Sequence, residues 1–223
     1  IQEAQRIGKK VLCIVTGVPG AGKTLAGLNV AHDPTVRALT NGAGVFLSGN
    51  GPLVTIVSAA IVRDFKKKQR GVDAARTVST FIQNVHAFIK DSFPRRVAPI
   101  EHLIIFDEAQ RAWDAKQCAK KNDRNESEPE SILSIMDRHP DWAVVVALVG
   151  NGQEINTGEA GLAEWGRALQ SRFQHWEVAV SPRVLGNAQG DKTQQLFVNG
   201  ESSGLKIHEV PALHLDVSLR SYK

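Results

Sequence analysis

The sequence contains few cysteines and no long hydrophobic run, and these absences exclude several classes of protein. Only Cys13 and Cys118 are present among 223 residues, so neither a disulfide framework nor the paired cysteine spacing of a zinc site is available. No apolar run approaches the ~20 residues that a membrane-spanning helix needs, and the first residues lack the pattern of a secretory signal. We find no internal repeat and no low-complexity tract. We therefore expect a cytoplasmic protein of a reducing compartment with no membrane partner.

The composition is that of an ordinary globular domain with a modest basic excess. Hydrophobic residues make up 42% and charged residues 22% of the chain, which is long enough to bury one substantial core. The net charge of +4 is compatible with a polyanionic partner but does not identify one. Because the chain begins with Ile1 rather than methionine, we expect it to be a piece of a longer protein.

Short apolar segments alternate with helix-compatible segments along most of the chain. The pattern predicts strands at residues 11–16, 44–48, 102–106, 142–149 and 175–180, and helices at 23–31, 53–68, 131–138 and 161–171. Residues 81–89 are compatible with a strand or a helix, and the charged residues 115–128 are predicted to form an exposed helix and loop. This alternation predicts an α/β fold in which a parallel β-sheet is sandwiched between helices, in three αβα layers.

A glycine-rich turn follows the first predicted strand. Residues 17–24 read GVPGAGKT, which matches a glycine, four residues and then Gly-Lys-Ser/Thr. Glycines let backbone N–H groups turn inward on a phosphate, and the next helix presents the positive end of its dipole. In this pattern Lys23 reaches the β- and γ-phosphates of ATP, and the Thr24 hydroxyl binds Mg²⁺. The alternative is a glycine-rich turn beside a solvated lysine. The candidate nucleotide-binding residues are Gly17, Gly20, Ala21, Gly22, Lys23, Thr24 and Leu25.

Two acidic residues, Asp107 and Glu108, follow the strand predicted at 102–106. Ligands of open α/β sheets bind outside the carboxyl ends of the strands, so we expect these acids to converge with the glycine-rich turn. Asp107 is then a candidate Mg²⁺ residue together with Thr24. Glu108 is the candidate to orient and deprotonate the attacking water. Acids at strand ends can instead be solubilising caps, but the neighbouring phosphate loop favours the catalytic interpretation.

An uncharged amide follows the strand predicted at 142–149, where residues 150–153 read GNGQ. Gln153 can contact a γ-phosphate or an attacking water without neutralising Glu108, which predicts a sensor of hydrolysis. Because Asn-Gly is a common turn dipeptide, a simple turn is the alternative.

Several long motifs occur in a fixed order: TGVPGAGKT, VFLSGNGPLV, FIQNVHAF, IIFDEAQRAWD, the segment from SIMDRHP to WGRAL, and the closing VSLRSYK. In these motifs the chain resembles the Schlafen group 3-like DNA/RNA helicase domain, a P-loop NTPase related to superfamily 1 helicases, over nearly its whole length. The resemblance implies two RecA-like lobes with ATP bound between them and single-stranded DNA or RNA lying across both. It implies a RecA-like ATPase lobe at residues 1–181. Residues 182–223 would then be a connecting segment and the truncated start of a second RecA-like lobe. The rest of that second lobe, which is absent from this chain, would be its partner.

The resemblance also implies roles for individual residues. Residues 48–53 and 84–88 correspond to two motifs that contact the nucleic acid. Gln153 takes the sensor role, although Asn151 replaces the usual aspartate and the spacing is one residue shorter. Arg220 corresponds to an arginine that reaches the γ-phosphate. The candidate catalytic residues are thus Lys23, Glu108, Gln153 and Arg220.

Basic and aromatic side chains are further candidates for contacts with nucleic acid. Phosphate contacts by a basic cluster would depend strongly on salt, but cations at a helix end are commonly just solvated. Trp113 and His86 can stack on bases, and a structural role is the alternative for His86. We expect the other three tryptophans to be buried anchors: Trp142, Trp165 and Trp176. The basic candidates are Arg63, Lys66, Lys67, Lys68, Arg70, Arg95 and Arg96.

These features together predict an ATPase of the helicase kind, which couples ATP hydrolysis to translocation on nucleic acid or to its remodelling. The alternative is a nucleotide-gated switch that senses nucleic acid without unwinding it. A P-loop kinase fits less well, because activation of water by Glu108 would be superfluous in a kinase.

Overall fold

The computed structural model describes residues 1–40, 44–68, 78–79, 81–150, 159, 161–185, 195–197 and 204–219. Its centre is a parallel sheet with the strand order β3-β2-β4-β5-β1-β6-β7, and β8 pairs with the end of β1. The strands are β1 (Lys10–Gly17), β2 (Gly44–Ser48), β3 (Ile82–Asn84), β4 (Leu103–Asp107), β5 (Ala143–Leu148), β6 (Glu177–Val180), β7 (Lys206–Glu209) and β8 (His214–Leu215).

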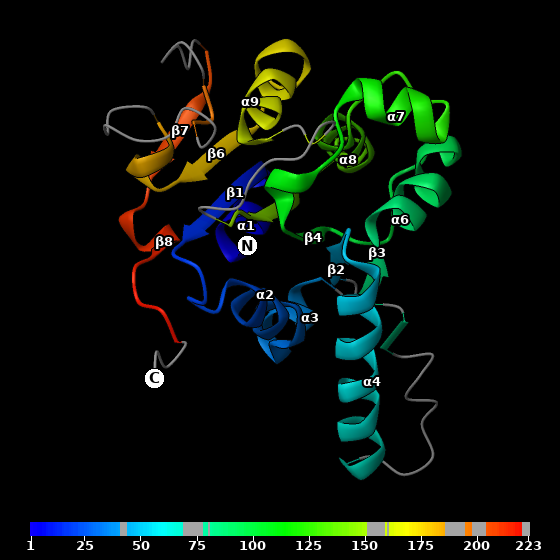
Figure 1. The fold of residues 1–223 in the computed structure, drawn as a ribbon. Coiled ribbons are helices and arrows are strands. Elements are labelled where there is room, and N and C mark those ends of the chain that lie inside the picture. Colours follow the sequence, from blue (N-terminus) through cyan, green and yellow to red (C-terminus); the bar gives the residue numbers. More distant parts are fainter. Residues whose placement is uncertain are drawn as a thin grey trace.

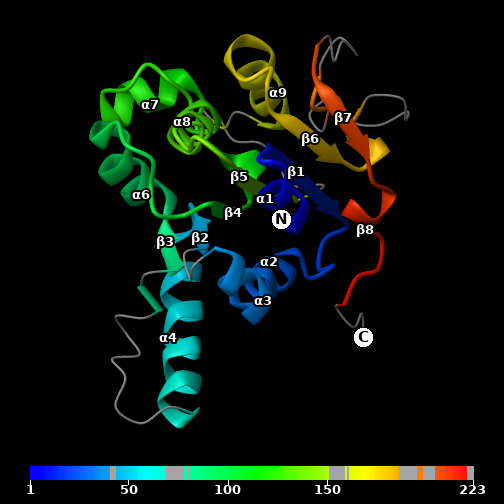
Figure 2. The ribbon, with the colours of Figure 1, turned by 180° about the vertical axis from the view of Figure 1, so that it is seen from behind.

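Helices cover both faces of the sheet, which makes three layers (Figure 1). One face packs against α1 (Gln2–Ile7), α2 (Lys23–His32), α3 (Pro34–Leu39) and α4 (Gly51–Lys68). The other packs against α6 (Val85–Ser92), α8 (Glu128–Met136) and α9 (Gly161–Arg172), with α7 (Ala115–Asn122) on the same side. Figure 2 shows from behind that the far part of α4 extends away from the sheet. Short 3-10 helices are η1 (Phe93–Arg95), η2 (Ala109–Arg111), η3 (Pro182–Val184) and η5 (Pro211–Leu213).

The strands supply a core on each face by alternation of their side chains. In β4, Leu103 and Ile105 belong to the cluster on the α2 face, whereas Ile104 and Phe106 belong to the cluster on the α8 face. Every residue of β2 and β4 is buried, as expected for parallel strands that are covered on both sides. The predicted three-layer α/β fold is therefore confirmed.

The parallel pairing places the carboxyl ends of the strands at one rim of the sheet. Ser48, the last residue of β2, is in register with Asp107 on one side and with Asn84 on the other. The end of β1 lies beside the end of β5, where Val15 pairs with Leu148. This rim therefore gathers the residues that follow β1, β2, β4 and β5.

Some local predictions were incomplete, because tertiary packing and helix caps determine where these elements begin and which residues are buried. Residues 81–89 contain both a strand and a helix, since the Asn84 side chain accepts hydrogen bonds from the N–H groups of His86 and Ala87 and starts α6. The helix predicted at 131–138 begins earlier, at Glu128, and the Ser127 side chain caps it. The prediction of an exposed segment at 115–128 was wrong for Cys118, Ser127 and Glu128, which are at most 1% exposed.

The first and last parts of the described chain contain elements that periodicity did not reveal. Helices α1 and α3 and strands β7 and β8 are short, and β7 and β8 pair with β6 and β1. The division of the chain at residue 181 stays a prediction. Among the described residues, no helix combines the length and apolar character that crossing a bilayer requires.

Candidate functional site

The glycine-rich turn joins β1 to α2 at the carboxyl rim of the sheet. Gly20 and Gly22 have φ angles of 75° and 85°, in the left-handed region that favours glycine, and Gly22 is the N-cap of α2. The backbone N–H groups of the first turn of α2 lack intrahelical partners and can bind an anion. Residues 19–25 line a cavity of about 410 Å³ together with Leu28, Glu108 and Gly150. The turn is thus shaped to receive a phosphate.

Lys23 lies at the start of α2 and folds back over the turn. Its Nζ donates hydrogen bonds to the carbonyl oxygens of Gly17, at 2.7 Å, and Val18, at 3.2 Å. Partial burial lowers the pKa of this ammonium, while the nearby charges of Glu108 and Asp107 oppose the shift. The lysine side chain therefore faces both the turn and the acids.

Thr24 and Asp107 meet across the sheet rim. The Thr24 hydroxyl lies 3.1 Å from both carboxylate oxygens of Asp107, which is only 2% exposed. Burial, and next the charge of Glu108, raise the pKa of Asp107 to about 6. A hydroxyl and a buried carboxylate are oxygen ligands of the kind that Mg²⁺ prefers, so this pair can hold that ion.

Glu108 follows Asp107 in a left-handed backbone conformation with φ of 54°. Its Oε2 accepts a hydrogen bond from Gln110 Nε2 at 2.5 Å, and Gln110 Oε1 accepts one from the Gly150 N–H at 2.9 Å. Trp165 Nε1 donates to the Ala109 carbonyl at 3.1 Å, which fixes η2 from the side of α9. Sequence reasoning missed Gln110, although its place three residues after Asp107 in the acidic motif was a usable signal.

A second cavity, of about 480 Å³, lies beside the first and shares Glu108 with it. Its lining includes His86 and Trp113, whose ring centroids are 4.1 Å apart, and the buried Glu128. Glu128 accepts hydrogen bonds from His86 Nδ1 at 2.6 Å and from the Trp113 N–H at 2.9 Å. The remaining lining residues are Gly49, Asn50, Val85, Phe106, Arg111 and Glu159.

The end of the described chain returns to the glycine-rich turn. β8 pairs with Thr16 and Gly17, and the Val18 N–H donates to the Leu215 carbonyl at 3.0 Å. The Leu219 N–H donates to the Gly20 carbonyl at 2.9 Å. Residue 220 therefore directly follows a residue that is hydrogen-bonded to the turn.

Residues 10–223 match the family described as Schlafen group 3, DNA/RNA helicase domain. The chain belongs to this family. A search of curated proteins found no match.

Two motifs that the resemblance assigned to nucleic-acid contact in this helicase domain line the second cavity. Gly49 and Asn50 come from residues 48–53, and Val85 and His86 come from residues 84–88. Both motifs follow strands that end at the same rim as β4.

The structure brings together some of the predicted site residues of the helicase domain and leaves others outside its described part. Lys23, Thr24, Asp107 and Glu108 share one rim, whereas Gln153 and Arg220 lie outside the described residues. The side chains of Lys66, Lys67 and Lys68, and the whole of Arg70, also lie outside them. The three tryptophans expected to be anchors are at most 5% exposed: Trp142, Trp165 and Trp176.

Proposed function

We propose that this domain binds ATP with Mg²⁺, hydrolyses it, and couples hydrolysis to translocation on single-stranded DNA or RNA or to its remodelling. The observation that carries the proposal is the arrangement of four side chains at one rim: Lys23, Thr24, Asp107 and Glu108. A second RecA-like lobe, supplied by chain outside these residues, would complete the nucleotide site, and Gln153 and Arg220 would act as sensor and γ-phosphate contact.

The glycine-rich turn would hold the phosphates of the nucleotide. The N–H groups at the start of α2 would donate to phosphate oxygens, and Lys23 would exchange the carbonyl oxygens of Gly17 and Val18 for the negatively charged oxygens of the phosphates. This exchange retains the hydrogen bonds of the ammonium and adds charge attraction.

Thr24 and Asp107 are the residues that would hold Mg²⁺. The raised pKa of Asp107 reflects a buried carboxylate whose nearest hydrogen-bond partner is a neutral hydroxyl, an environment that a cation would improve. When bound, Mg²⁺ would offset charge on the β- and γ-phosphates.

Glu108 would orient and deprotonate the attacking water. One of its carboxylate oxygens accepts the hydrogen bond from Gln110, and the cavity beside the glycine-rich turn gives the carboxylate access to the nucleotide. Gln110 holds this carboxylate against the end of β5 through the Gly150 N–H.

The second cavity would accept a base of the nucleic acid. His86 and Trp113 offer aromatic faces, and stacking on such faces tolerates any base. Arg111 lines the same cavity and could contact the phosphate backbone of the nucleic acid. In this structure its Nε lies 3.2 Å from Glu159 Oε1. Because Glu108 lines both cavities, occupation of one can change the position of the catalytic carboxylate in the other.

The test of hydrolysis is Glu108→Gln in the full-length protein. The variant should bind ATP with unchanged affinity and lose at least about 100-fold in kcat, the range of a general base. Glu3→Gln, which removes an exposed acid that pairs with Arg6, is the matched control and should leave kcat unchanged. Parental turnover in Glu108→Gln would refute the role of Glu108.

The test of nucleic-acid coupling is the ATPase rate against single- and double-stranded DNA and RNA at several salt concentrations. We expect stimulation by single strands, and we expect Trp113→Ala to reduce it while the basal rate is kept. An equal rate across the whole panel would contradict a motor. Stimulation without strand displacement would instead favour the nucleotide-gated switch.

A further inference from the structure

Three side chains with metal-binding atoms gather at the rim of the sheet opposite the glycine-rich turn. They are His102, His139 and Asp141, and one ligand atom from each lies within 4.8 Å of the other two. His102 precedes the first residue of β4, and Asp107 is its last, so the two rims are about 17 Å apart along the strand. The cluster is therefore separate from the proposed nucleotide site.

Backbone contacts hold all three residues of this cluster in place. His139 Nε2 lies 3.0 Å from the Glu101 carbonyl, and because a carbonyl only accepts, this nitrogen donates and Nδ1 retains its lone pair. A ligating histidine commonly donates its other ring N–H to such a carbonyl. The Trp142 N–H donates to Asp141 Oδ1 at 2.7 Å, which orients the carboxylate.

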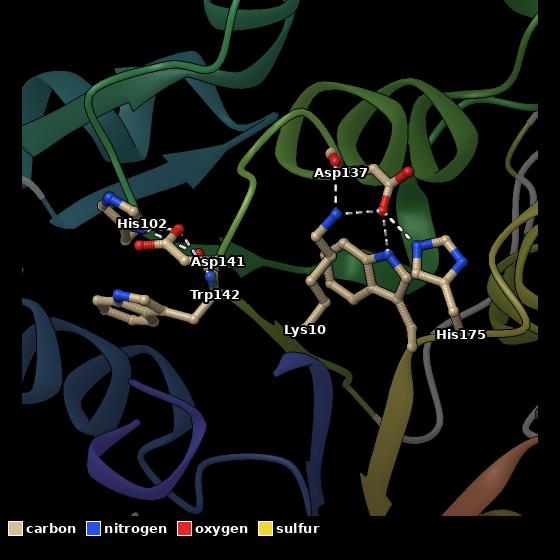
Figure 3. Close-up of polar contacts among 7 residues, drawn as sticks. Lys10, His102, Asp137, Asp141, Trp142 and His175 are labelled. Atoms are coloured by element: carbon tan, nitrogen blue, oxygen red, sulfur yellow. Dashed lines mark hydrogen bonds and ion pairs between the residues drawn. The ribbon is translucent and has the colours of Figure 1, made fainter. Parts of the chain in front are cut away.

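His102, the third member of the cluster, lies just before β4 and beside Asp141 (Figure 3). Its Nδ1 lies 3.9 Å from Asp141 Oδ1 and 2.8 Å from the Trp142 carbonyl, and its ring stacks on Trp142 with centroids 4.6 Å apart. The rings of His102 and His139 are 4.0 Å apart. Because the Trp142 carbonyl only accepts, His102 Nδ1 carries the ring proton. Coordination through Nδ1 would require this proton to move to Nε2, and would replace the hydrogen bond to the Trp142 carbonyl by a bond to the metal.

The nearby Asp137, at the same rim, is a carboxylate that accepts hydrogen bonds from several side chains, and it serves as a comparison for Asp141. Asp137 Oδ1 accepts from Lys10 at 3.0 Å, from His175 at 2.6 Å and from Trp176 at 2.9 Å (Figure 3). The Asp141 side chain is 56% exposed and faces imidazole rings.

We propose that His102, His139 and Asp141 bind a divalent ion of the zinc type. Two imidazoles and one carboxylate form a ligand set used by Zn²⁺, and the exposure of Asp141 leaves room for water as a fourth ligand. Bond lengths of about 2.0–2.1 Å in a tetrahedral site place ligand atoms about 3.3 Å apart, so binding would draw the three residues together. The ion would tie the start of β4 to the loop before β5.

The experiment is a Zn²⁺ titration of the metal-stripped full-length protein against a chromophoric chelator. Excess Mg²⁺ is present throughout, because Mg²⁺ prefers oxygen ligands and would occupy the Asp107 site but not this one. The test variants are Asp141→Asn, which retains an oxygen acceptor for the Trp142 N–H, and His102→Gln. His175→Gln is the matched control, since His175 is a histidine of the same rim outside the cluster.

We expect one Zn²⁺ per chain, a rise in the Tm of the parent on Zn²⁺ addition, and at least about tenfold weaker binding in each test variant. His175→Gln should bind as the parent does. If the parent binds no Zn²⁺, or if Asp141→Asn and His102→Gln both bind it with parental affinity, the proposal is overturned. Circular dichroism of each variant separates loss of the site from loss of the fold.

Discussion

Gln110→Ala is the most informative single change, because one buried amide connects Glu108 to the end of β5. Gln110 is 4% exposed, and its two amide atoms contact Glu108 Oε2 at 2.5 Å and the Gly150 N–H at 2.9 Å. Alanine removes both hydrogen bonds and leaves the η2 backbone contact of Trp165 in place. The change therefore releases the carboxylate without unfolding the segment that carries it.

Two magnitudes follow from these contacts. In Gln110→Ala, the Gly150 N–H and the Glu108 carboxylate each lose a hydrogen-bond partner, which should lower the free energy of unfolding by about 1–3 kcal/mol. A catalytic group displaced by about 1 Å loses on the order of 100-fold in rate, so kcat should fall by about that factor with little change in KM for ATP. A residue with only a structural role would lower stability and leave kcat unchanged.

The assay is steady-state ATP hydrolysis of the full-length protein at a temperature well below the Tm of the variant. Gln174→Ala is the matched control, because Gln174 is exposed and its amide donates to the Gln170 carbonyl of its own segment. The reasoning is refuted if Gln110→Ala loses stability as expected and still turns over ATP within about twofold of the parent.

Two further predictions concern stability. Asp107→Asn should stabilise the metal-free protein at pH 8 by up to about 3 kcal/mol, because the carboxyl pKa of about 6 lies above its ordinary value of 3.8. Parental stability falls as pH rises from 3.8 to 6, and the variant should lack this fall when unfolding is followed by urea titration at each pH. Gly166→Ala should lower the Tm by about 6–12 °C in scanning calorimetry, since a Cβ would lie 1.8 Å from the Leu196 carbonyl oxygen and such overpacking costs about 3 kcal/mol. Gly51→Ala, which has open space around its Cβ, should leave the Tm nearly unchanged.

The central sheet could be predicted because its strands are continuous apolar runs. The strands predicted at 44–48 and 102–106 correspond closely to β2 and β4, and both are buried on two faces. Helix α3 escaped prediction because it is only six residues long and depends on its Asp33 cap. β7 escaped because exposed polar residues form much of it, and β8 because it is only two residues long; pairing with neighbours decides the state of both.

The cavity at the glycine-rich turn could be predicted better than the cavity beside it. Asp107 ends β4, and Lys23 and Thr24 start the helix that follows β1, so the rule for parallel sheets brings them together from spacing alone. Glu128 is distant in sequence from His86, and charge density placed it on the surface. The capping pattern of Ser127 with Glu130 was an overlooked signal for the start of α8, whereas the burial of Glu128 depends on its two partners, which spacing does not reveal.

The backbone at Glu108 joins these observations physically. A left-handed conformation at a non-glycine residue costs about 1–3 kcal/mol and persists only where neighbouring contacts maintain it. Here the contacts come from the Gln110 amide, which donates to the Glu108 carboxylate, and from Trp165, which donates to the Ala109 carbonyl. Because the carboxylate itself lines both cavities, a shift of η2 that relaxes this backbone would move the same group in both. Under the proposed function, this strained acid is a direct physical connection between ATP hydrolysis in one cavity and a nucleic-acid strand in the other.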